Sequence, residues 1–250
     1  LKTDCTVFRG SIFVTEAIQP IEELSARDYG RPGTDSKSGM LPPKLAKMLI
    51  NLCGIKKNHQ HAARILDPFC GSGTLIMEAF LMGYTHLVGR DLSETAIVDT
   101  KKNINWVIHS SQKEDAESTV RVDVGVQDVQ TLSESVEKNS IDAIVTEPFM
   151  GKPLHGTESK MMLEKQANEL STLYIAAFQS FVDVLKKNAV VVMIIPKFLY
   201  GKEWITIDCQ KDILALGFAP VPLLDEHVSL VYHRPKQFVA REIWKYKKLS

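Results

Sequence analysis

The chain has 250 residues, of which 44% are hydrophobic and 24% charged, and its 30 Lys and Arg residues balance its 30 Asp and Glu residues. This composition is typical of a soluble globular protein, and it lacks the strong basic excess that by itself points to nucleic acid. Zero net charge does not exclude RNA binding, because only the local field at the docking surface must be positive.

Cysteine and histidine usage indicates neither a disulfide framework nor a metal site. The four cysteines are far apart and form no CxxC pair, and the seven histidines show no metal-ligand spacing. We therefore expect free thiols in a reducing, cytoplasmic compartment and no metal. No run approaches about 18 uninterrupted apolar residues and no signal peptide is evident, so we expect no membrane contact.

The first part of the chain differs in pattern from the rest. Val7 to Thr15 could form a strand, and Leu24 to Lys37 is rich in charge, Gly and Pro without a clear period. Met40 to Leu52 becomes helical after Pro42-Pro43, a pair that suits a helix N-terminus. We predict that residues 1–52 form an N-terminal extension packed near the functional site of a domain spanning residues 53–250.

From residue 64 onward, short β-branched runs alternate with helical patterns, which is typical of a parallel sheet with crossover helices. The predicted strands are Arg64–Asp67, His86–Asp91, Val120–Val126, Ile141–Thr146 and Val190–Ile195. The predicted helices are Ser72–Met82, Ser93 to about Trp106, Glu158–Lys187 with one break, and Ile207–Leu216. We expect Phe218–Leu224 and His227–His233 to form a terminal hairpin, followed by a last strand over Val239–Tyr246.

The segment Asp67–Thr74, with the sequence DPFCGSGT, lies between a predicted strand and a predicted helix. Gly71 and Gly73 allow the backbone to turn sharply and to approach a ligand, toward which the helix N-terminal amides point. The dinucleotide fingerprint would require a third glycine at position 76, which is Ile. An NAD-dependent enzyme is therefore disfavoured, and no hydride-handling His or Tyr constellation stands out.

Two further acids follow predicted strands at the same expected sheet edge. Asp91 ends the second strand, where an acid commonly accepts hydrogen bonds from ribose hydroxyls. Asp128 follows the third strand and could receive an adenine amino group. The alternative interpretation is structural: a Gly-x-Gly turn with a downstream acid is often only a turn, and Asp128 could equally be a loop or capping residue.

The fourth predicted strand ends in Thr146-Glu147-Pro148-Phe149-Met150-Gly151. A carboxylate there can hold an amino group, and an aromatic ring can stack on a flipped base. The alternative is a proline-containing turn with a buried Phe149.

Taken together, these motifs resemble a known family. DPFCGSGT is similar to the cofactor loop of class I methyltransferases that act on amino groups of nucleic acids. With the Glu147-Pro148-Phe149 segment and the upstream Arg31-Pro32…Gly39-Met40-Leu41-Pro42-Pro43 stretch, the chain resembles the THUMP-associated tRNA guanine-N2 methyltransferases from about residue 27 to its end.

This resemblance implies a Rossmann-like doubly wound α/β sheet with an antiparallel last strand. It also implies S-adenosyl-L-methionine as cofactor and methylation of an exocyclic amine, most directly guanine N2 in tRNA. The alternatives that stay open are a DNA or rRNA amino-methyltransferase and a catalytically silent cofactor-binding scaffold. A cytosine-C5 enzyme is discounted, because no cysteine follows the fourth strand.

Particular residues take particular roles under this resemblance. Glu147 would accept a hydrogen bond from the target amine, Pro148 would supply a nearby backbone carbonyl, and Phe149 would stack on the base. Asp91 would hold the ribose and Asp128 the adenine. The implied cofactor-binding residues are Asp67, Phe69, Cys70, Gly71, Gly73, Thr74, Asp91, Leu92, Asp128, Val129 and Pro42.

The chain departs from the family in two respects. The family pattern is Asp-Pro-Pro-Tyr, often followed by Gly. Aligned on the glycine, this chain has Glu147, Phe149 and Met150 in place of the Asp, the second Pro and the Tyr. Shifted by one position, Thr146 takes the place of the acid and Phe149 that of the aromatic residue. The family also carries an N-terminal THUMP domain, for which we see no room. We therefore expect RNA affinity to come from a separate domain, a partner protein or another surface.

Two basic sets are candidates for contact with phosphates. One lies near the expected site and comprises Arg27, Arg31, Lys37 and Lys44. The other is interleaved with aromatic residues near the C-terminus and comprises Arg234, Lys236, Phe238, Arg241, Trp244, Lys245, Tyr246, Lys247 and Lys248. For the second set we favour a plain final strand with one solvated face and one buried aromatic face.

Overall fold

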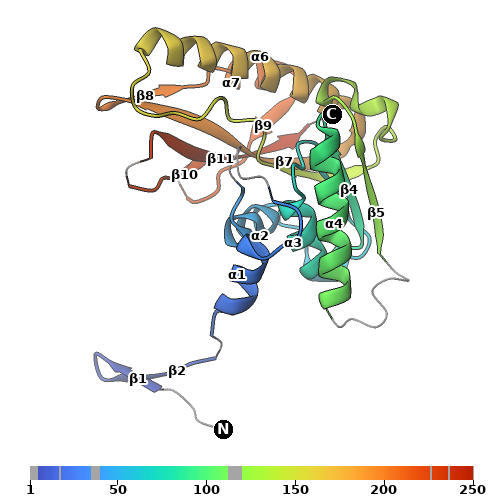
Figure 1. The fold of residues 1–250 in the computed structure, drawn as a ribbon, viewed down its shortest axis with the longest axis vertical. Coiled ribbons are helices and arrows are strands. Elements are labelled where there is room, and N and C mark those ends of the chain that lie inside the picture. Colours follow the sequence, from blue (N-terminus) through green and yellow to red (C-terminus); the bar gives the residue numbers. More distant parts are fainter. Residues whose placement is uncertain are drawn as a thin grey trace.

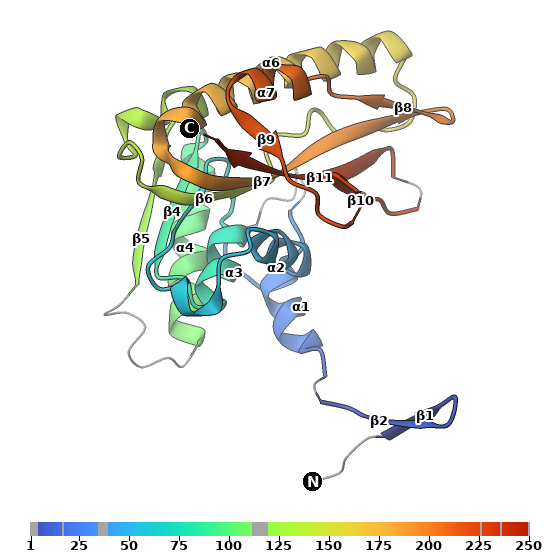
Figure 2. The same cartoon turned by 180° about the vertical axis from the view of Figure 1, so that it is seen from behind.

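The computed structural model describes residues 5–16, 18–34, 40–111, 120–225, 227–235 and 237–249. At the N-terminal end, strands β1 (Cys5–Phe8) and β2 (Ser11–Val14) form an antiparallel hairpin that projects from the body of the molecule (Figures 1 and 2). The predicted single strand over Val7–Thr15 was wrong, because Arg9 and Gly10 both take positive φ and turn the chain. No helix in these ranges has the length and apolar character to cross a membrane.

Nine strands form one sheet in the order β10-β11-β7-β6-β3-β4-β5, with β8 beside β7 and β9 beside β11. The neighbours from β7 to β5 in this order are parallel, whereas β11 is antiparallel to β7. This confirms the predicted doubly wound sheet with an antiparallel last strand. The strands are β3 (Arg64–Asp67), β4 (His86–Asp91), β5 (Arg121–Val126), β6 (Ile141–Thr146), β7 (Leu185–Tyr200), β8 (Glu203–Thr206), β9 (Phe218–Pro220), β10 (Ser229–Tyr232) and β11 (Val239–Lys248).

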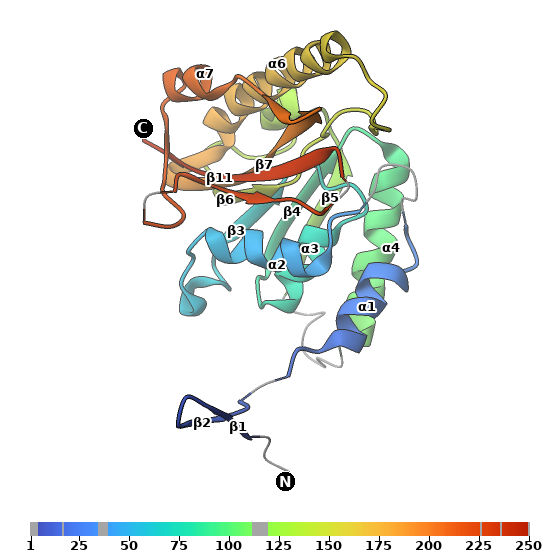
Figure 3. The same ribbon diagram turned by 90° about the vertical axis from the view of Figure 1, so that its left-hand side faces the viewer.

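Helices cover both faces of the sheet, as Figure 3 shows. Helices α2 (Pro43–Leu52), α3 (Thr74–Leu81) and α4 (Glu94–Ser110) bury Leu49 and Ile76 against one face. Helix α6 (Lys160–Val184), the 3-10 turn η2 (Val129–Glu134) and α7 (Gln210–Ala215) bury Phe178 and Phe181 against the other. The remaining elements are α1 (Ile21–Tyr29) and the 3-10 turn η1 (Lys57–His59).

The strand order reverses at β3, which pairs with β4 on one side and β6 on the other. In an open α/β sheet, the loops at the carboxyl ends of the strands flanking such a reversal form the ligand crevice. The loops that follow β3, β4 and β6 are therefore the positions at which to look for a site.

Several predicted boundaries differ from the structure. The long helix is unbroken from Lys160 to Val184, and the following strand extends to Tyr200, which β8 continues through a Gly201 turn. The predicted terminal hairpin is confirmed only at its turn, where Leu224 and His227 form one antiparallel bridge, and its extended pairing was wrong, because β9 and β10 each pair with β11. Strand β11 is long enough to pair with β10 along Arg241–Trp244 and with β9 along Tyr246–Lys248, so both strands form their backbone hydrogen bonds with β11.

Candidate active site

The loop between β3 and α3 turns sharply at its two glycines. Gly71 and Gly73 have φ of 52° and 85°, a left-handed backbone that favours glycine. A Cβ on Gly73 would lie 2.9 Å from Thr100 Cγ2, and the Thr100 hydroxyl donates to the Gly71 carbonyl at 2.6 Å. The loop is therefore packed directly on α4.

Gly73→Ala is expected to lower the free energy of unfolding by about 2 kcal/mol or more, because the new methyl group adds a clash with Thr100 to the backbone strain. Gly71→Ala is the matched control: its φ is also positive, but a Cβ there has no heavy atom within 4 Å. Urea unfolding of both variants measures the difference. Equal stabilities would contradict the proposed close approach of the loop to α4.

Asp67, at the end of β3, is almost fully buried. Its Oδ1 accepts hydrogen bonds from the Thr146 hydroxyl at 2.7 Å and from the Phe69 N–H at 3.2 Å. Burial raises the pKa of the Asp67 carboxyl to about 7, a shift that these two hydrogen bonds oppose. The Thr146 bond joins the end of β3 to the end of β6.

Two further residues of the loop, Phe69 and Cys70, pack their side chains against the interior. Phe69 packs against the core beneath α6, and Cys70 is buried between Gly89 and Thr100. Burial raises the pKa of the Cys70 thiol well above its ordinary value, so it is a poor nucleophile. Cys70 can therefore meet a ligand mainly through its backbone, whereas the half-buried Phe69 ring keeps some exposed surface.

Asp91, at the end of β4, has both carboxylate oxygens engaged with backbone amides. Oδ2 accepts from Gly71 N–H at 2.9 Å, and Oδ1 accepts from Ser93 N–H at 2.9 Å. Asp91 thus holds the glycine loop in place, a role that its position in the sequence did not reveal. Leu92, beside it, is exposed.

Asp128 lies next to Asp91 because the Gln127 N–H donates to the Asp91 carbonyl at 3.0 Å. Its side chain caps η2 by accepting from Gln130 N–H at 2.9 Å, as the structural interpretation of this acid anticipated. Val129 is buried in the core beneath α6, so only its backbone can face the crevice.

The segment after β6 presents an exposed ring beside a paired carboxylate. Phe149 is 57% exposed, so the interpretation of a buried Phe was wrong, whereas Pro148 is buried. Glu147 Oε1 accepts from Arg241 Nε on β11 at 2.6 Å, with both side chains mostly buried. Arg241 had been assigned only to the C-terminal basic set, and no spacing in the sequence connects it to Glu147.

Two residues of α6 form hydrogen bonds with the backbone of the segment that follows β6. The Tyr174 hydroxyl donates to the Phe149 carbonyl at 2.8 Å, and Gln166 Oε1 accepts from Lys152 N–H at 3.0 Å. Gly151 takes a φ of 91°, and a Cβ there would lie 2.5 Å from Gln166 Nε2. The segment is thus held with the Phe149 ring facing solvent.

Most of the basic set near the site is not free to bind phosphate. Arg27 and Arg31 are buried, and Arg27 Nε is bonded to Glu78 Oε1 at 2.6 Å. Lys37 lies outside the described residues, and Lys44 donates to Gln19 on the surface. The prediction that Arg27 and Arg31 contact RNA phosphates was therefore wrong. Pro42, which precedes α2 at its N-cap position, is half-buried.

The C-terminal basic set forms a final strand with a buried aromatic face, as favoured above. Tyr246 is buried and stacks on Trp244, and Lys248 Nζ donates to the Val182 and Leu185 carbonyls. Arg241 is engaged with Glu147, and Lys236 lies outside the described residues. Among the described members of this set, Arg241 and Lys248 are therefore engaged within the domain and not available to RNA.

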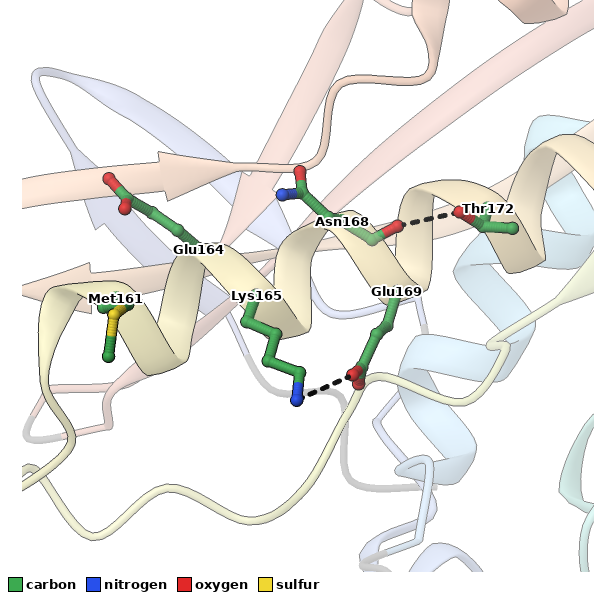
Figure 4. A pocket seen from close by; sticks show the side chains of 6 residues that line it. All are labelled: Met161, Glu164, Lys165, Asn168, Glu169 and Thr172. Carbon is green, nitrogen blue, oxygen red and sulfur yellow. Dashed lines mark hydrogen bonds and ion pairs between the residues drawn. The ribbon is translucent and has the colours of Figure 1, made fainter.

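A surface hollow of about 460 Å³ lies on the outer side of α6 and is lined by Met161, Glu164, Lys165, Asn168, Glu169 and Thr172 (Figure 4). Its polar groups are exposed, and its one ion pair joins Lys165 to Glu169 at 4.0 Å. Because it lies on the opposite side of the sheet from α3, it does not belong to the crevice of the glycine loop.

A doubly wound sheet with a glycine-rich loop and acids at the carboxyl ends of neighbouring strands is the architecture in which α/β domains bind nucleotide cofactors. The chain belongs to the UPF0020 family, described as the RMKL-like methyltransferase domain, whose model matches residues 32–200. The chain is therefore a methyltransferase domain.

Two curated relatives and one solved structure are similar to the chain. A tRNA (guanine(10)-N2)-dimethyltransferase from Methanothermobacter thermautotrophicus is 32% identical over 117 residues, which are 45% of this chain and 28% of the relative. A probable tRNA (guanine(10)-N2)-dimethyltransferase from Methanothermococcus thermolithotrophicus is 30% identical over 149 residues, 60% and 77% of the two chains. TrmN from Thermus thermophilus has the same fold, with a TM-score of 0.60 and 20% identity over 95% of this chain and 56% of that one.

The chain spans only 28% to 44% of the length of three full curated relatives that it matches. The substrate and partners of such longer proteins come to this chain only as proposals.

Proposed function

We propose that this domain transfers a methyl group from S-adenosyl-L-methionine to the exocyclic N2 amine of a guanine in tRNA. The observation that carries the proposal is the Asp67–Thr146 hydrogen bond of 2.7 Å, which joins the glycine-loop strand to the strand bearing Glu147 and Phe149. A cofactor loop and a base-holding segment would then face one another. The similarity to two tRNA (guanine(10)-N2)-dimethyltransferases, one of them described as probable, supports guanine N2 as the target.

The residues of the crevice fit this cofactor. Asp67 would face its methionine ammonium, Asp91 and Leu92 its ribose, and Asp128 with Val129 its adenine. Gly71 and Gly73 leave room for close backbone approach, and Phe69, Cys70, Thr74 and Pro42 complete the lining. When bound, the cofactor supplies an electrophilic methyl group.

The protein's main task is then alignment of the amine with that methyl group. We propose that Glu147 accepts a hydrogen bond from one N–H of the target amine, so that the nitrogen lone pair faces the methyl donor. The carbonyls around Pro148 would accept from the other N–H. The Phe149 ring, held outward by Tyr174, would stack on the flipped guanine.

Substrate RNA also needs a docking surface, and four members of the two basic sets are buried or paired within the domain: Arg27, Arg31, Arg241 and Lys248. We propose that a separate RNA-binding domain or partner protein supplies it. We further propose that residues 1–52 form an extension that closes one side of the site, a view supported by the Arg31 bond to Thr74 in the first turn of α3. The proposed compartment is the cytoplasm.

Nucleoside mass spectrometry tests the function: unmodified tRNA, rRNA and DNA are each incubated with the protein and S-adenosyl-L-methionine. We expect N2-methylguanosine in tRNA. Methylated guanosine in rRNA alone would favour the runner-up, which rests on a 35% identity over 89 residues to a ribosomal RNA large subunit methyltransferase K/L from a Psychrobacter strain. If the protein binds the cofactor but forms no product even when the separate RNA-binding domain or partner protein is supplied, the result would support a catalytically silent scaffold.

A further inference from the structure

Arg31 is a buried cation whose hydrogen bonds are incomplete. The residue is 3% exposed, and one of its terminal nitrogens donates to the Thr74 hydroxyl at 2.5 Å. Its Nε and its other terminal nitrogen are buried and have no hydrogen-bond partner in the part of the chain that the structure describes. Buried polar groups are nearly always paired, so two orphan donors on one guanidinium need an explanation.

The neighbouring acids do not satisfy Arg31. Glu78 is fully buried, but its Oε1 accepts from Arg27 Nε at 2.6 Å and its Oε2 lies 3.5 Å from Lys47 Nζ. Asp28 and Glu78 stabilise the charge of Arg31 only at a distance, and desolvation is the larger effect, which lowers the pKa of the guanidinium. Among the acids that the structure describes, none therefore contacts Arg31 directly.

The position of Arg31 indicates where a contacting anion belongs. Thr74 is the first residue of α3, and the first hydrogen bond of this helix runs from the Met77 N–H to the Gly73 carbonyl. Gly73 provides no side-chain cap, so the amides of Thr74, Leu75 and Ile76 precede the helical ladder. Such a helix end attracts an anion.

The backbone next to Arg31 is fixed to the glycine loop. Asn103 on α4 accepts from the Gly33 N–H at 2.7 Å and donates both to the Gly33 carbonyl and to the Ser72 carbonyl. A Cβ on Gly33 would lie 2.7 Å from Asp99 Cβ, so this close packing requires glycine. Arg31 and the loop are thus held together before any ligand binds.

Resting on the proposed function, we propose that Arg31, with Thr74 and the first amides of α3, binds the α-carboxylate of the methionine moiety of S-adenosyl-L-methionine. A carboxylate matches the planar fork of donors that Arg presents. The near-complete burial of Arg31 excludes the RNA backbone as its partner and favours a small group inside the crevice. Arg31 then selects a cofactor by its carboxylate, at the opposite end from the adenine.

Isothermal titration calorimetry with S-adenosyl-L-methionine and with its decarboxylated analogue tests this proposal. The wild-type protein is expected to prefer the intact cofactor by about 10- to 100-fold, the range that a charge-assisted hydrogen bond supports. Arg31→Gln is expected to remove this preference by weakening only the intact cofactor. Arg27→Gln is the matched control, since it removes a neighbouring buried guanidinium that is already paired, and it should keep the preference.

A second measurement uses the wild-type protein, so that it does not depend on whether Arg31→Gln folds. In the wild type, the Nε–H resonance of Arg31, assigned with Arg31→Lys, should shift on addition of the intact cofactor and stay in place with the analogue. Without ligand, Arg31→Met should melt no lower than the wild type, because it removes orphan donors, whereas a structural ion-pair role predicts a lower Tm.

The outcomes separate this inference from the proposed function. If the wild type binds the intact cofactor and Arg31→Gln keeps the same preference, the inference alone fails. Equal weakening of both ligands in Arg31→Gln, or an unmoved resonance, would also overturn it. If the wild type binds neither ligand, the proposed cofactor falls together with the role of Arg31.

Discussion

Glu147→Ala is expected to lower kcat for methyl transfer about 10²- to 10³-fold, the range seen when a hydrogen-bonding group that acts on the reacting atoms is removed. One oxygen of Glu147 is held by Arg241 at 2.6 Å, and the other forms no hydrogen bond in the part of the chain that the structure describes. That second oxygen is the acceptor proposed for the amine. Cofactor affinity, measured by calorimetry, should change less than about threefold, because Glu147 lies on the base side of the crevice.

Three variants separate this role from the loss of an ion pair. Arg241→Met also breaks the pair but leaves the carboxylate, so its kcat should exceed that of Glu147→Ala. Glu147→Gln keeps an acceptor oxygen and should be intermediate. Glu169→Ala, on the outer side of α6 (Figure 4), breaks an exposed pair and should be silent.

Phe149 provides an independent check on the same segment. If Glu147→Ala and Phe149→Ala both retained full turnover on tRNA, the assignment of this segment to the substrate would be wrong. Because the Phe149 ring is largely exposed, its truncation should weaken substrate binding without unfolding the domain.

The comparison of sequence with structure shows which features local patterns encode. Strands β3, β4 and β6 were predicted to the residue, because buried parallel strands are continuous apolar runs bounded by turn residues. The positions of the loop glycines and of three acids were likewise predictable, since Asp67 and Asp91 end β3 and β4 and Asp128 follows β5 by two residues. Family resemblance then supplied the cofactor and the substrate class.

The parts that were missed depend on contacts between distant residues. Arg241 is 94 positions from Glu147, and Arg31 is 43 positions from Thr74, so no local period reports either contact. Helix α1 was missed because it is polar, with a buried Arg27 paired to Glu78 in place of an apolar stripe. The hairpin error has the same origin: the competition between β9, β10 and β11 for backbone partners is decided only in the assembled sheet.

Because the proposed site places the methionine ammonium beside the buried carboxyl of Asp67, we expect binding of S-adenosyl-L-methionine to depend on pH. In the free protein, burial raises its pKa to about 7, so at pH 6 the carboxyl is mostly protonated. A methionine ammonium bound beside it favours the charged form and lowers that pKa. Binding therefore releases a proton, and the association constant of S-adenosyl-L-methionine should rise with pH by up to about tenfold per unit below pH 7 and then level off.

Calorimetry between pH 5.5 and 7 in buffers of different ionisation enthalpy measures this release directly, and in that range α-amino groups stay mostly protonated. Asp67→Asn should bind the cofactor more weakly and lose both the pH dependence and the proton release, and retention of both would contradict the assignment of the ammonium to Asp67.

The same raised pKa predicts how the free energy of unfolding changes with pH. The folded state binds the Asp67 proton more tightly than the unfolded state, so this contribution to stability is full below about pH 4 and is lost as the pH rises to about 7. The cofactor and the fold thus prefer opposite protonation states of one carboxyl, which is the arrangement expected where a buried acid serves a cationic ligand and not the packing around it.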